Sequence, residues 1–434
     1  FAPPAGLWYV TASMQSNSFY RRPLPEGLVH FACAEGRAIF REALAEGNLE
    51  GWFALAEQFH TQADPAFCGL GTLVVALNAL GVDPGRLWKG PWRWYSEELL
   101  DCCLPLDTVR SAGVTLDQFA CLARCNGATT QTHRATESSL GVFRADLRAA
   151  ATTPAGSVVA AAYSRRALGQ TGDGHYSPVA GIHAKRDLAL VLDVARFKYP
   201  PHWVPIATLW EAMQTLDPAT GRSRGWVTLR RRELGAAVLF RLSDARLPWA
   251  EIARRMLVDL PSALCALKPE RAGDIAQALV RIMPPDTVSA LTTVTASLET
   301  LAPEHRAQAV ALREALRATK LHAEVVRALK ARDLTPANES PVEVWTMLLL
   351  ALPDATFEGL APAARDELAA LRRTDALPAI LRTEAEILRE QMVALDEAYG
   401  ASEESCTRCG PTGSDVRPGD TCQPSGRPET PPLV

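Results

Sequence analysis

The stretch FHTQADPAFCGLGTLVVALNAL, residues 59–80, decides how the first half of this chain folds. An apolar run follows Cys68, and Gly81 stands directly after that run. Asp64 followed by Pro65 resembles an N-cap with proline at the first helical position, and glycine is common just past a helix end. The pattern predicts a buried helix with Cys68 in or near its first turn.

A thiol at the start of a helix has two opposite interpretations. Unpaired N–H groups and the helix dipole act on it, and such sites lower a thiol pKa from about 8.5 toward roughly 3.5–7.5. A cysteine that opens an apolar run is also an ordinary small core residue. The position of Cys68 alone therefore does not distinguish a nucleophile from a packing residue.

Length, composition and charge are those of an ordinary globular protein. The chain has 434 residues, 47% of them apolar and 22% charged, with a net charge of -4. The net negative charge offers no electrostatic basis for binding nucleic acid or an anionic membrane. No run of about 18 uncharged apolar residues is present, so we expect no transmembrane helix. The first residues lack the basic and apolar regions of a secretory signal.

Ten cysteines are spread thinly over the chain. They are too sparse for a disulfide scaffold, and no secretory signal is recognisable, so we expect reduced thiols and a cytoplasmic protein. In such a compartment cysteines are structural, metal-binding or catalytic. Thinly spread thiols also argue against a metal-buffering protein, because buffering proteins concentrate their thiols.

Three regions of different texture follow one another. Residues 1–232 mix helical and strand patterns, whereas residues 233–400 repeat apolar residues at helical spacing between prolines. Residues 401–434 are rich in Ser, Gly and Pro and nearly lack large apolar groups, so we expect disorder there. The predicted fold class is α+β, with a first domain over 1–232, a mainly helical region, and a disordered tail that contains cysteines.

Three segments of the first region are typical of strands, since they are short, β-branched or alternating, and flanked by turn residues. They are SVVAAAYSR, HYSPVAGIHA and LALVLDVARF, which begin at Ser157, His175 and Leu188. The charged turn between the second and third segments predicts that they pair as adjacent antiparallel strands.

A base that activates a thiol is most often a histidine, and His175 is the most distinctive of the eight in the chain. It follows the glycine-rich turn GQTGDG and opens a predicted strand. His183 and His202 are rivals, whereas His60 is expected on the surface or in a loop. Because strand side chains alternate with a period of two, His175 and His183 fall on one face, and parity does not choose between them.

An acid and an amide complete the set of candidates. Asp193 lies in the apolar segment LVLDVARF, where a carboxylate costs free energy unless it is paired, so it is a candidate to orient the histidine. Gln62 precedes Cys68 by six residues. Its amide can join the Cys68 backbone N–H as an oxyanion hole. The ordered set of Gln, Cys, His and Asp is typical of a papain-like site.

The first half resembles the phytochelatin synthases, which are papain-like acyltransferases. The resemblance runs from about residue 16 to about residue 231 and is carried by SNSFYRRPLP, TQADPAFCGLGTLVVALNALGVDPGR, YSRRALGQTGDGHYSP and above all LDVARFKYPPHWV. It implies a papain-like catalytic domain at residues 1–232 and a regulatory role for residues 233–400. By position, the family nucleophile, base, acid and oxyanion glutamine fall on Cys68, His175, Asp193 and Gln62. Phe67 stands where the family commonly has tyrosine, which puts a minor substrate contact in doubt.

The resemblance also implies the reaction. Cys68 attacks the Cys–Gly peptide carbonyl of glutathione, glycine leaves, and the γ-glutamylcysteinyl group passes to a second glutathione or a growing phytochelatin. The family places Arg165, Lys198 and Asp217 around the acceptor site, where cations suit substrate carboxylates. Two alternatives stay open: these are ordinary surface charges, or the enzyme is a peptidase that removes glycine from glutathione or its conjugates.

The resemblance implies no organic cofactor, and cadmium or zinc as an activator that acts as a metal–glutathione thiolate. Four cysteines match family positions and are candidate metal ligands, namely Cys102, Cys103, Cys121 and Cys125. The last two lie at i and i+4, so they share a helix face and can meet a soft metal or fill a core. Three tail cysteines have weaker metal-ligand spacing, namely Cys406, Cys409 and Cys422. The expected partners are glutathione, phytochelatins and metal ions, and a homodimer is compatible with the sequence.

Overall fold

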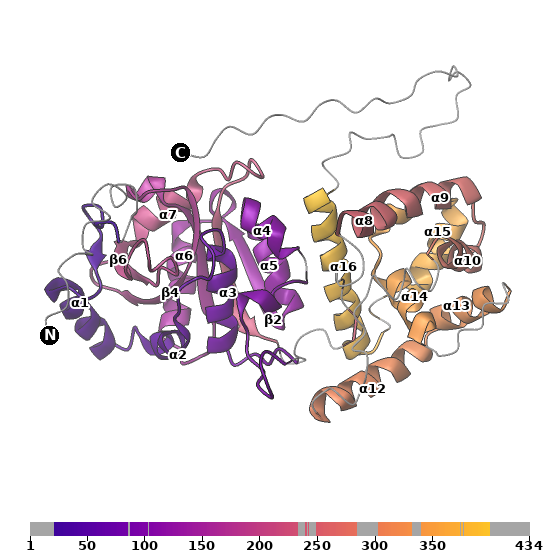
Figure 1. The fold of residues 1–434 in the computed structure, drawn as a ribbon, viewed down its shortest axis with the longest axis horizontal. Helices are drawn as coiled ribbons and strands as arrows, with labels where there is room; N and C mark the ends of the chain where they lie inside the picture. Colours follow the sequence, from indigo (N-terminus) through magenta and orange to yellow (C-terminus); the bar gives the residue numbers. More distant parts are fainter. Residues whose placement is uncertain are drawn as a thin grey trace, which may run out of the picture.

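A seven-stranded antiparallel sheet organises the first half of the chain in this computed structural model (Figure 1). Its strand order is β1-β6-β5-β4-β3-β7-β2. The strands are β1 Val29–His30, β2 Ala128–Arg134, β3 Val158–Ser164, β4 Gly174–His183, β5 Leu188–Val191, β6 His202–Pro205 and β7 Gly225–Arg231. The structure describes residues 21–85, 87–102, 104–232, 239–240, 242, 249–283, 303–331, 340–373, 375 and 377–399. The expected disordered tail, residues 401–434 with its three cysteines, lies outside these residues, as does Cys103.

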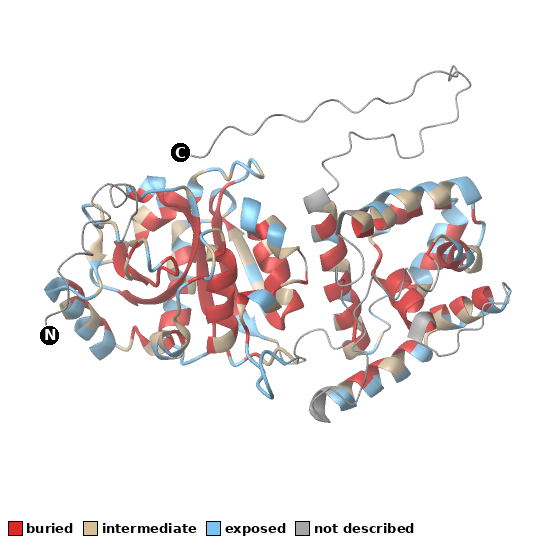
Figure 2. Ribbon diagram, viewed as in Figure 1, coloured by how far each residue is buried: buried red, intermediate tan, exposed pale blue. Residues whose placement is uncertain are grey.

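The central strand β3 is buried on both faces and separates two hydrophobic cores. Val158, Ala160 and Ala162 pack into one core, whereas Val159, Ala161 and Tyr163 pack into the other. Small alternating side chains suit a strand that is covered on both sides. Figure 2 shows the strands as an almost continuous buried layer between helices.

Helices cover both faces of this sheet. The core shared with α3 also includes α1 and α5, and the core on the other face includes α6 and α7. The helices of this half are α1 Ala34–Ala45, α2 Glu50–Gln58, α3 Cys68–Ala79, α4 Leu106–Ala112, α5 Leu116–Cys125, α6 Leu140–Ala151 and α7 Ile206–Gln214. Strands and helices pack around one antiparallel sheet, which confirms the predicted α+β class.

The helix α3 begins at Cys68, later than the Asp64–Pro65 pattern predicts. Asp64 instead closes a turn before the helix: its side chain accepts the Ala66 N–H at 3.0 Å, and its carbonyl accepts the Phe67 N–H at 2.9 Å. The expected end of the helix is confirmed, because Leu80 is the C-cap and Gly81 follows with a φ of +62°. The correction places the thiol on the first residue of the helix.

Two expectations about the strands are wrong in detail. β4 and β5 are antiparallel neighbours, as predicted, but β5 ends at Val191, so Asp193 lies beyond the strand. The pairing of β4 with β5 shifts register between Val179 and Gly181. Such a bulge breaks the alternation of side chains, so the parity argument that put His175 and His183 on one face does not hold.

The second half of the described chain is helical, as expected. Its α-helices are α8 Trp249–Ala253, α9 Leu260–Leu267, α10 Ala272–Ile282, α12 Pro303–Arg317, α13 Lys320–Lys330, α14 Ser340–Ala351, α15 Pro362–Leu371 and α16 Ala379–Tyr399. They enclose a separate core in which Trp345 is fully buried. None of the helices in the described ranges has the length and apolar character that a membrane span requires.

The long helix α16 joins the two halves. It packs against α5 of the first half, and its Ile387 is buried in the same core as α3 (Figure 1). Arg124 of α5 forms an ion pair with Glu390 of α16 at 2.6 Å. The helical region is therefore docked on the α3 side of the sheet.

Candidate active site

Three elements bring Cys68, His175 and Asp193 to one place. Cys68 opens α3, His175 lies at the start of β4, and Asp193 follows the end of β5. His175 and Asp193 are buried, with exposed fractions of 4% and 0%. The Cys68 thiol lies close enough to Tyr176, the residue after His175, for the backbone N–H of Tyr176 to act to lower the pKa of the thiol. The structure thus brings together the three side chains that the sequence singled out.

The imidazole of His175 is held by Asp193. Its Nε2 lies 3.0 Å from Asp193 Oδ1, which also accepts the Ala195 N–H at 2.9 Å. Arg165 Nη2, which can only donate, lies 2.8 Å from the same Nε2, so the contacts with Asp193 and Arg165 favour opposite tautomers of the ring. In the tautomer that donates from Nε2 to Asp193, Nδ1 is left as the nitrogen that accepts a proton. This is the arrangement that a general base requires.

The pKa of the Cys68 thiol is not lowered, contrary to what the position of the residue at the start of a helix had suggested. Burial raises the pKa of Cys68 above its ordinary value, although the N–H groups of Tyr176 and Gly69 and the charge of Arg165 act to lower it. Burial, and then the charge of Arg165, lower the pKa of His175 to about 4. The two reactive groups are therefore neutral at pH 7, and the thiol needs His175 to take its proton. The first turn of a helix does not lower the thiol pKa here, because desolvation outweighs it.

Arg165 lies inside the site, beside the acid. It is 2% exposed, its Nη2 donates to Asp193 Oδ1 at 2.8 Å, and its Nη1 donates to Gln170 Oε1 at 2.6 Å. The guanidinium also lies 5.1 Å from the centroid of the Tyr199 ring. Although burial disfavours the ionised form of Asp193, the charges of His175 and Arg165 hold its pKa well below the ordinary value. The alternative that Arg165 is an ordinary surface charge is therefore wrong.

The other two candidates for the acceptor site lie in loops. Burial, and then the charge of Arg165, lower the pKa of Lys198, so its ammonium is close enough to feel that guanidinium. Lys198 Nζ also approaches Gly172, where an added Cβ would lie 3.1 Å from it. Asp217 lies in the turn before β7 and accepts the Ala219 N–H at 3.1 Å. The structure thus brings Lys198 near Arg165, whereas the Asp217 carboxylate accepts a hydrogen bond within its own turn.

Gln62 links the acid segment to the start of α3. Its backbone N–H donates to Val194 O at 3.0 Å, next to Asp193. Its side-chain Nε2 donates to Asp64 O at 2.8 Å and to Pro65 O at 2.9 Å. The amide is buried, and its Oε1 has no hydrogen-bond partner among the described residues. In the free protein the amide hydrogens face the turn carbonyls, and hydrogen bonds of this kind often realign when substrate binds.

Sequence reasoning missed one residue next to this loop. Glu97 is buried and contacts both His60 and the Ala63 N–H. His60, which we expected on the surface or in a loop, is half-buried by this ion pair. No spacing signal in the sequence connects Glu97 to the loop, since 37 residues separate it from His60.

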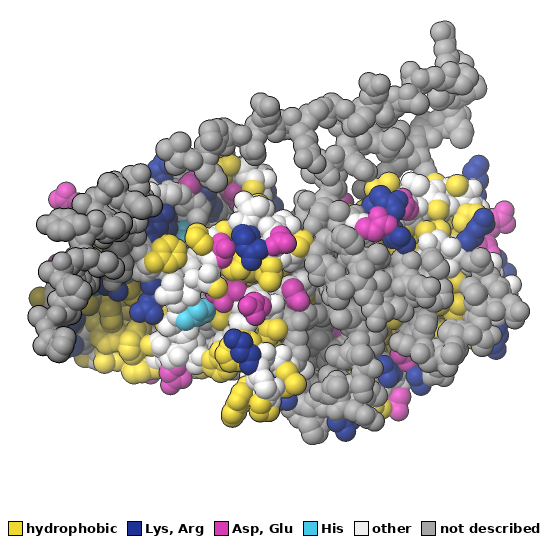
Figure 3. All heavy atoms as spheres, viewed as in Figure 1, with side chains coloured by type: hydrophobic (Ala, Val, Ile, Leu, Met, Phe, Trp, Pro, Cys, Tyr) yellow, Lys and Arg dark blue, Asp and Glu magenta, His cyan; other side chains and the backbone are white. Residues whose placement is uncertain are grey.

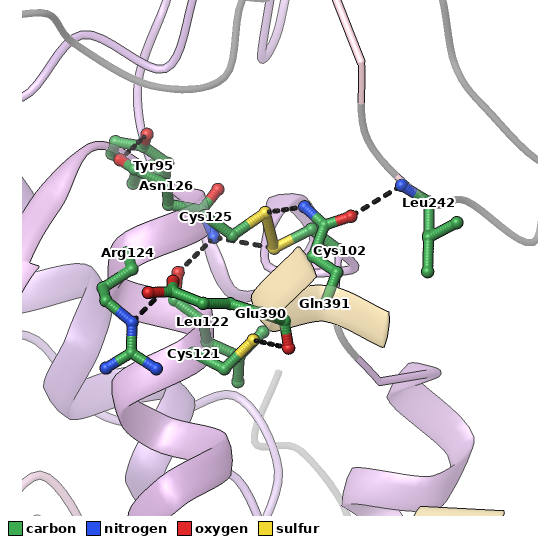
Figure 4. Close-up of a disulfide and its surroundings, with 10 residues drawn as sticks. All are labelled: Tyr95, Cys102, Cys121, Leu122, Arg124, Cys125, Asn126, Leu242, Glu390 and Gln391. Carbon is green, nitrogen blue, oxygen red and sulfur yellow. Dashed lines mark hydrogen bonds and ion pairs between the residues drawn. A yellow bond between two sulfur atoms is a disulfide. The ribbon is translucent and has the colours of Figure 1, made fainter. Parts of the chain in front are cut away.

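The cysteines proposed as metal ligands are arranged differently from the expectation. Cys102 and Cys125 form a disulfide, with their Cα atoms 6.7 Å apart, which corrects the expectation of reduced thiols (Figure 4). Cys121 instead donates to Glu390 O of α16 at 3.6 Å, while Gln391 Nε2 donates to Cys125 Sγ at 2.8 Å (Figure 4). The pair at i and i+4 is thus not free to hold a metal in this state. Within the described ranges, no group of three or more His, Cys, Asp or Glu side chains can hold a metal ion.

Part of the chain is similar to known proteins. The family model described as phytochelatin synthase matches residues 19–226. The chain is 46% identical over 271 residues to glutathione gamma-glutamylcysteinyltransferase 1 of Triticum aestivum, covering 62% of this chain and 53% of the relative. It is 43% identical over 272 residues to glutathione gamma-glutamylcysteinyltransferase 1 of Arabidopsis thaliana, covering 62% and 56%. It is 45% identical over 240 residues to the enzyme of the same name from Schizosaccharomyces pombe, covering 55% and 58%.

The matched region contains the whole candidate site. The chain spans about half the length of the curated relatives it matches, with coverage of 53% and 56% for the two plant proteins above. Cys68, His175, Asp193 and Gln62 all lie within residues 19–226. Residues 19–226 of this chain therefore belong to the phytochelatin synthase family.

Proposed function

We propose that this protein is a glutathione γ-glutamylcysteinyltransferase that makes phytochelatins through a thioester on Cys68. The observation that carries the proposal is the buried His175–Asp193 pair, together with a helix N-terminal thiol that feels the charges of Arg165 and Asp193. This pairing lies within the part of the chain that matches relatives named for that activity. The proposed papain-like fold of the domain rests on the same arrangement and on the family.

In the first half-reaction Cys68 is the nucleophile. His175 Nδ1 takes the thiol proton as the sulfur attacks the carbonyl carbon of the Cys–Gly bond of glutathione. The Cys68 N–H, together with the amide of Gln62 once it turns from its loop carbonyls, stabilises the oxyanion. His175 then gives its proton to the departing amine, glycine leaves, and a γ-glutamylcysteinyl thioester remains. Asp193 stabilises the imidazolium that forms in between.

In the second half-reaction the amine of another glutathione or of a phytochelatin attacks the thioester. His175 accepts the amine proton and returns it to the sulfur, so a new peptide bond forms and the thiol is restored. Lys198 offers a cation for an acceptor carboxylate. Arg165 acts mainly on Asp193, with which its guanidinium is paired. Asp217 stays a candidate contact for the acceptor substrate.

Metal activation is part of the proposal, with the metal as part of the substrate. Cadmium or zinc enters as a glutathione thiolate, which is the route that the family resemblance implies. We expect no organic cofactor. The physiological role that follows is detoxification of heavy metals in the cytoplasm. Figure 3 shows acidic and basic side chains together on the visible face of the first half, so a nucleic-acid or membrane partner is not part of the proposal.

The experiment is an incubation with glutathione and cadmium, with the products separated by mass. Oligomers of the form (γ-Glu-Cys)n-Gly support transfer, whereas γ-Glu-Cys and glycine alone would establish the alternative, a peptidase. A Cys68 adduct heavier by one γ-glutamylcysteinyl unit identifies the thioester. Replacing the three tail cysteines, Cys406, Cys409 and Cys422, tests the role of metal. Complete loss of cadmium-stimulated synthesis in that variant would overturn the substrate-thiolate route.

A further inference from the structure

A buried carboxylate lies behind the loop that carries Gln62. Glu97 belongs to the short helix η1, Glu97–Leu99, and is 6% exposed. Its Oε1 lies 3.1 Å from His60 Nε2 and accepts the Ala63 N–H at 3.2 Å. One oxygen of Glu97 therefore holds both His60 and Ala63, which lie on either side of Gln62 in the sequence.

The same carboxylate and Gln62 both lie close to Gly71 of α3. A Cβ added to Gly71 of α3 would lie 3.1 Å from Gln62 Cβ and 3.6 Å from Glu97 Oε1. The buried glutamine, the carboxylate and the nucleophile helix thus meet at one point. Glycine at position 71 allows this approach, because a side chain there would press on Gln62.

Electrostatics strengthens the contact. Burial is the largest single effect on Glu97 and raises its pKa, but the hydrogen bond from His60, the backbone N–H groups of Glu97 and Ala63, and the charge of His60 together lower that pKa overall. The hydrogen bond with Glu97 raises the pKa of His60, against burial and the charge of Arg196. Arg196 lies 4.9 Å from the ring of Phe59, next to His60. A hydrogen bond with an ionised partner is roughly twice as strong as a neutral one, so Glu97 is a firm anchor for the loop.

We propose that Glu97, through His60 and the Ala63 N–H, is a positioning residue that holds the backbone of Gln62, so that its amide can turn from the loop carbonyls and complete the oxyanion hole of Cys68. The inference rests on the proposed function, because it concerns the acylation of Cys68. Glu97 does not touch the reacting atoms. It acts through the backbone on both sides of the glutamine.

The chemical consequence is specific to carbonyl attack. An oxyanion donor must lie within about 0.5 Å of its productive position. Residues 59–67 form no helix or strand, so the position of Gln62 depends on such anchors. Loss of Glu97 leaves the Ala63 N–H without its partner and lets the loop move. Attack on a peptide carbonyl then slows, whereas alkylation of the same thiol develops no oxyanion and does not need the glutamine.

The experiment compares these two reactions of Cys68 in the full chain. Glu97→Leu removes both contacts, Glu97→Gln keeps an acceptor oxygen without the charge, and Glu98→Gln changes the exposed neighbouring carboxylate as a control. We expect Glu97→Leu to lower kcat for glycine release about 10- to 100-fold, which is no more than the loss expected when an oxyanion-hole donor is removed. KM should change less than about twofold. Alkylation of Cys68 by iodoacetamide, followed on its peptide by mass, should change less than about twofold. The kcat of Glu97→Gln for glycine release should lie between the values of Glu97→Leu and the wild type.

Each outcome decides the matter. Equal losses in glycine release and alkylation would mean general damage to the site and would overturn the inference, as would unchanged glycine release in Glu97→Leu. If that variant does not fold, His60→Gln serves instead, with a smaller loss in kcat and alkylation unaffected. A wild-type protein that releases no glycine refutes the proposed function itself, and the inference falls with it. An active wild type with unaffected Glu97 and His60 variants refutes the inference alone.

Discussion

Replacing Arg165 by methionine tests whether this arginine serves the His175–Asp193 pair or the substrate. The guanidinium lies 2.8 Å from His175 Nε2 and 2.8 Å from Asp193 Oδ1, and it is one cause of the low pKa of His175. Methionine has a similar length and no charge. The variant therefore removes the nearest cation from a buried imidazole while it fills most of the space.

The size of the effect follows from the geometry. Two unit charges about 4 Å apart interact by about 4 kcal/mol at an effective dielectric constant of about 20, which corresponds to about 3 pKa units. Burial is the larger cause of the pKa of His175, and Asp193 acts in the opposite direction. We therefore expect a net rise of about one unit from the value of about 4 when Arg165 is lost. Removal of one partner from a buried charge pair should also cost about 3–5 kcal/mol of stability.

The assay is the pH dependence of kcat/KM for glycine release. The base must be neutral to accept the thiol proton, so the acid limb reports the pKa of His175 in the free enzyme. In Arg165→Met this limb should move to higher pH by about one unit. Arg166→Met is the matched control, because Arg166 is the exposed neighbour in the sequence and its limb should not move.

One result would refute this reasoning. An unchanged acid limb in Arg165→Met, together with a large rise in KM for glutathione, would mean that the arginine binds a substrate carboxylate. The role implied by the family resemblance would then hold, and the pairing with Asp193 in the free protein would not govern the base. A shifted limb with little change in KM establishes the positioning role.

Three further changes probe other parts of the molecule. Cys68→Ser should reduce glycine release by about 10³-fold or more without lowering the thermal midpoint, because the nucleophile is lost while the helix is kept. The wild-type free energy of unfolding should fall by up to about 3 kcal/mol from about pH 6.5 to about pH 4, because unfolded His175 binds a proton that the buried ring does not. Urea titrations of His175→Gln should show a free energy of unfolding that depends less on pH. Ile387→Ala should cost about 2–4 kcal/mol, since it empties a buried site between α16 and the first half.

Clear results would contradict each of these. A Cys68→Ser protein that still releases glycine would remove the nucleophile from the mechanism. A His175→Gln variant with the pH dependence of the wild type would mean that other groups carry the acid sensitivity. An Ile387→Ala variant as stable as the wild type would mean that α16 contributes little to the packing of the first half.

Much of the framework follows from local pattern. The apolar run after Cys68 predicts α3, the segment SVVAAAYSR predicts the strand β3, and the turn before Leu188 predicts the pairing of β4 with β5. These features depend on neighbours along the chain, which the sequence states directly. The order of glutamine, cysteine, histidine and aspartate indicated the candidate site, and the family resemblance chose His175 among the histidines.

Tertiary structure decided which side chains the candidate residues contact and how far they are buried. The bulge in β4 removed the parity between His175 and His183, and the pairing of His175 with Asp193 depends on where β4 begins and β5 ends. Burial of Arg165 beside the acid, and of Glu97 behind Gln62, has no signature in the chain. Burial also reversed the expected pKa of the thiol, because desolvation depends on everything packed around Cys68. Sequence determined which groups were available and on which elements, while distances and dielectric surroundings, set by the folded chain, decided their charge and their partners.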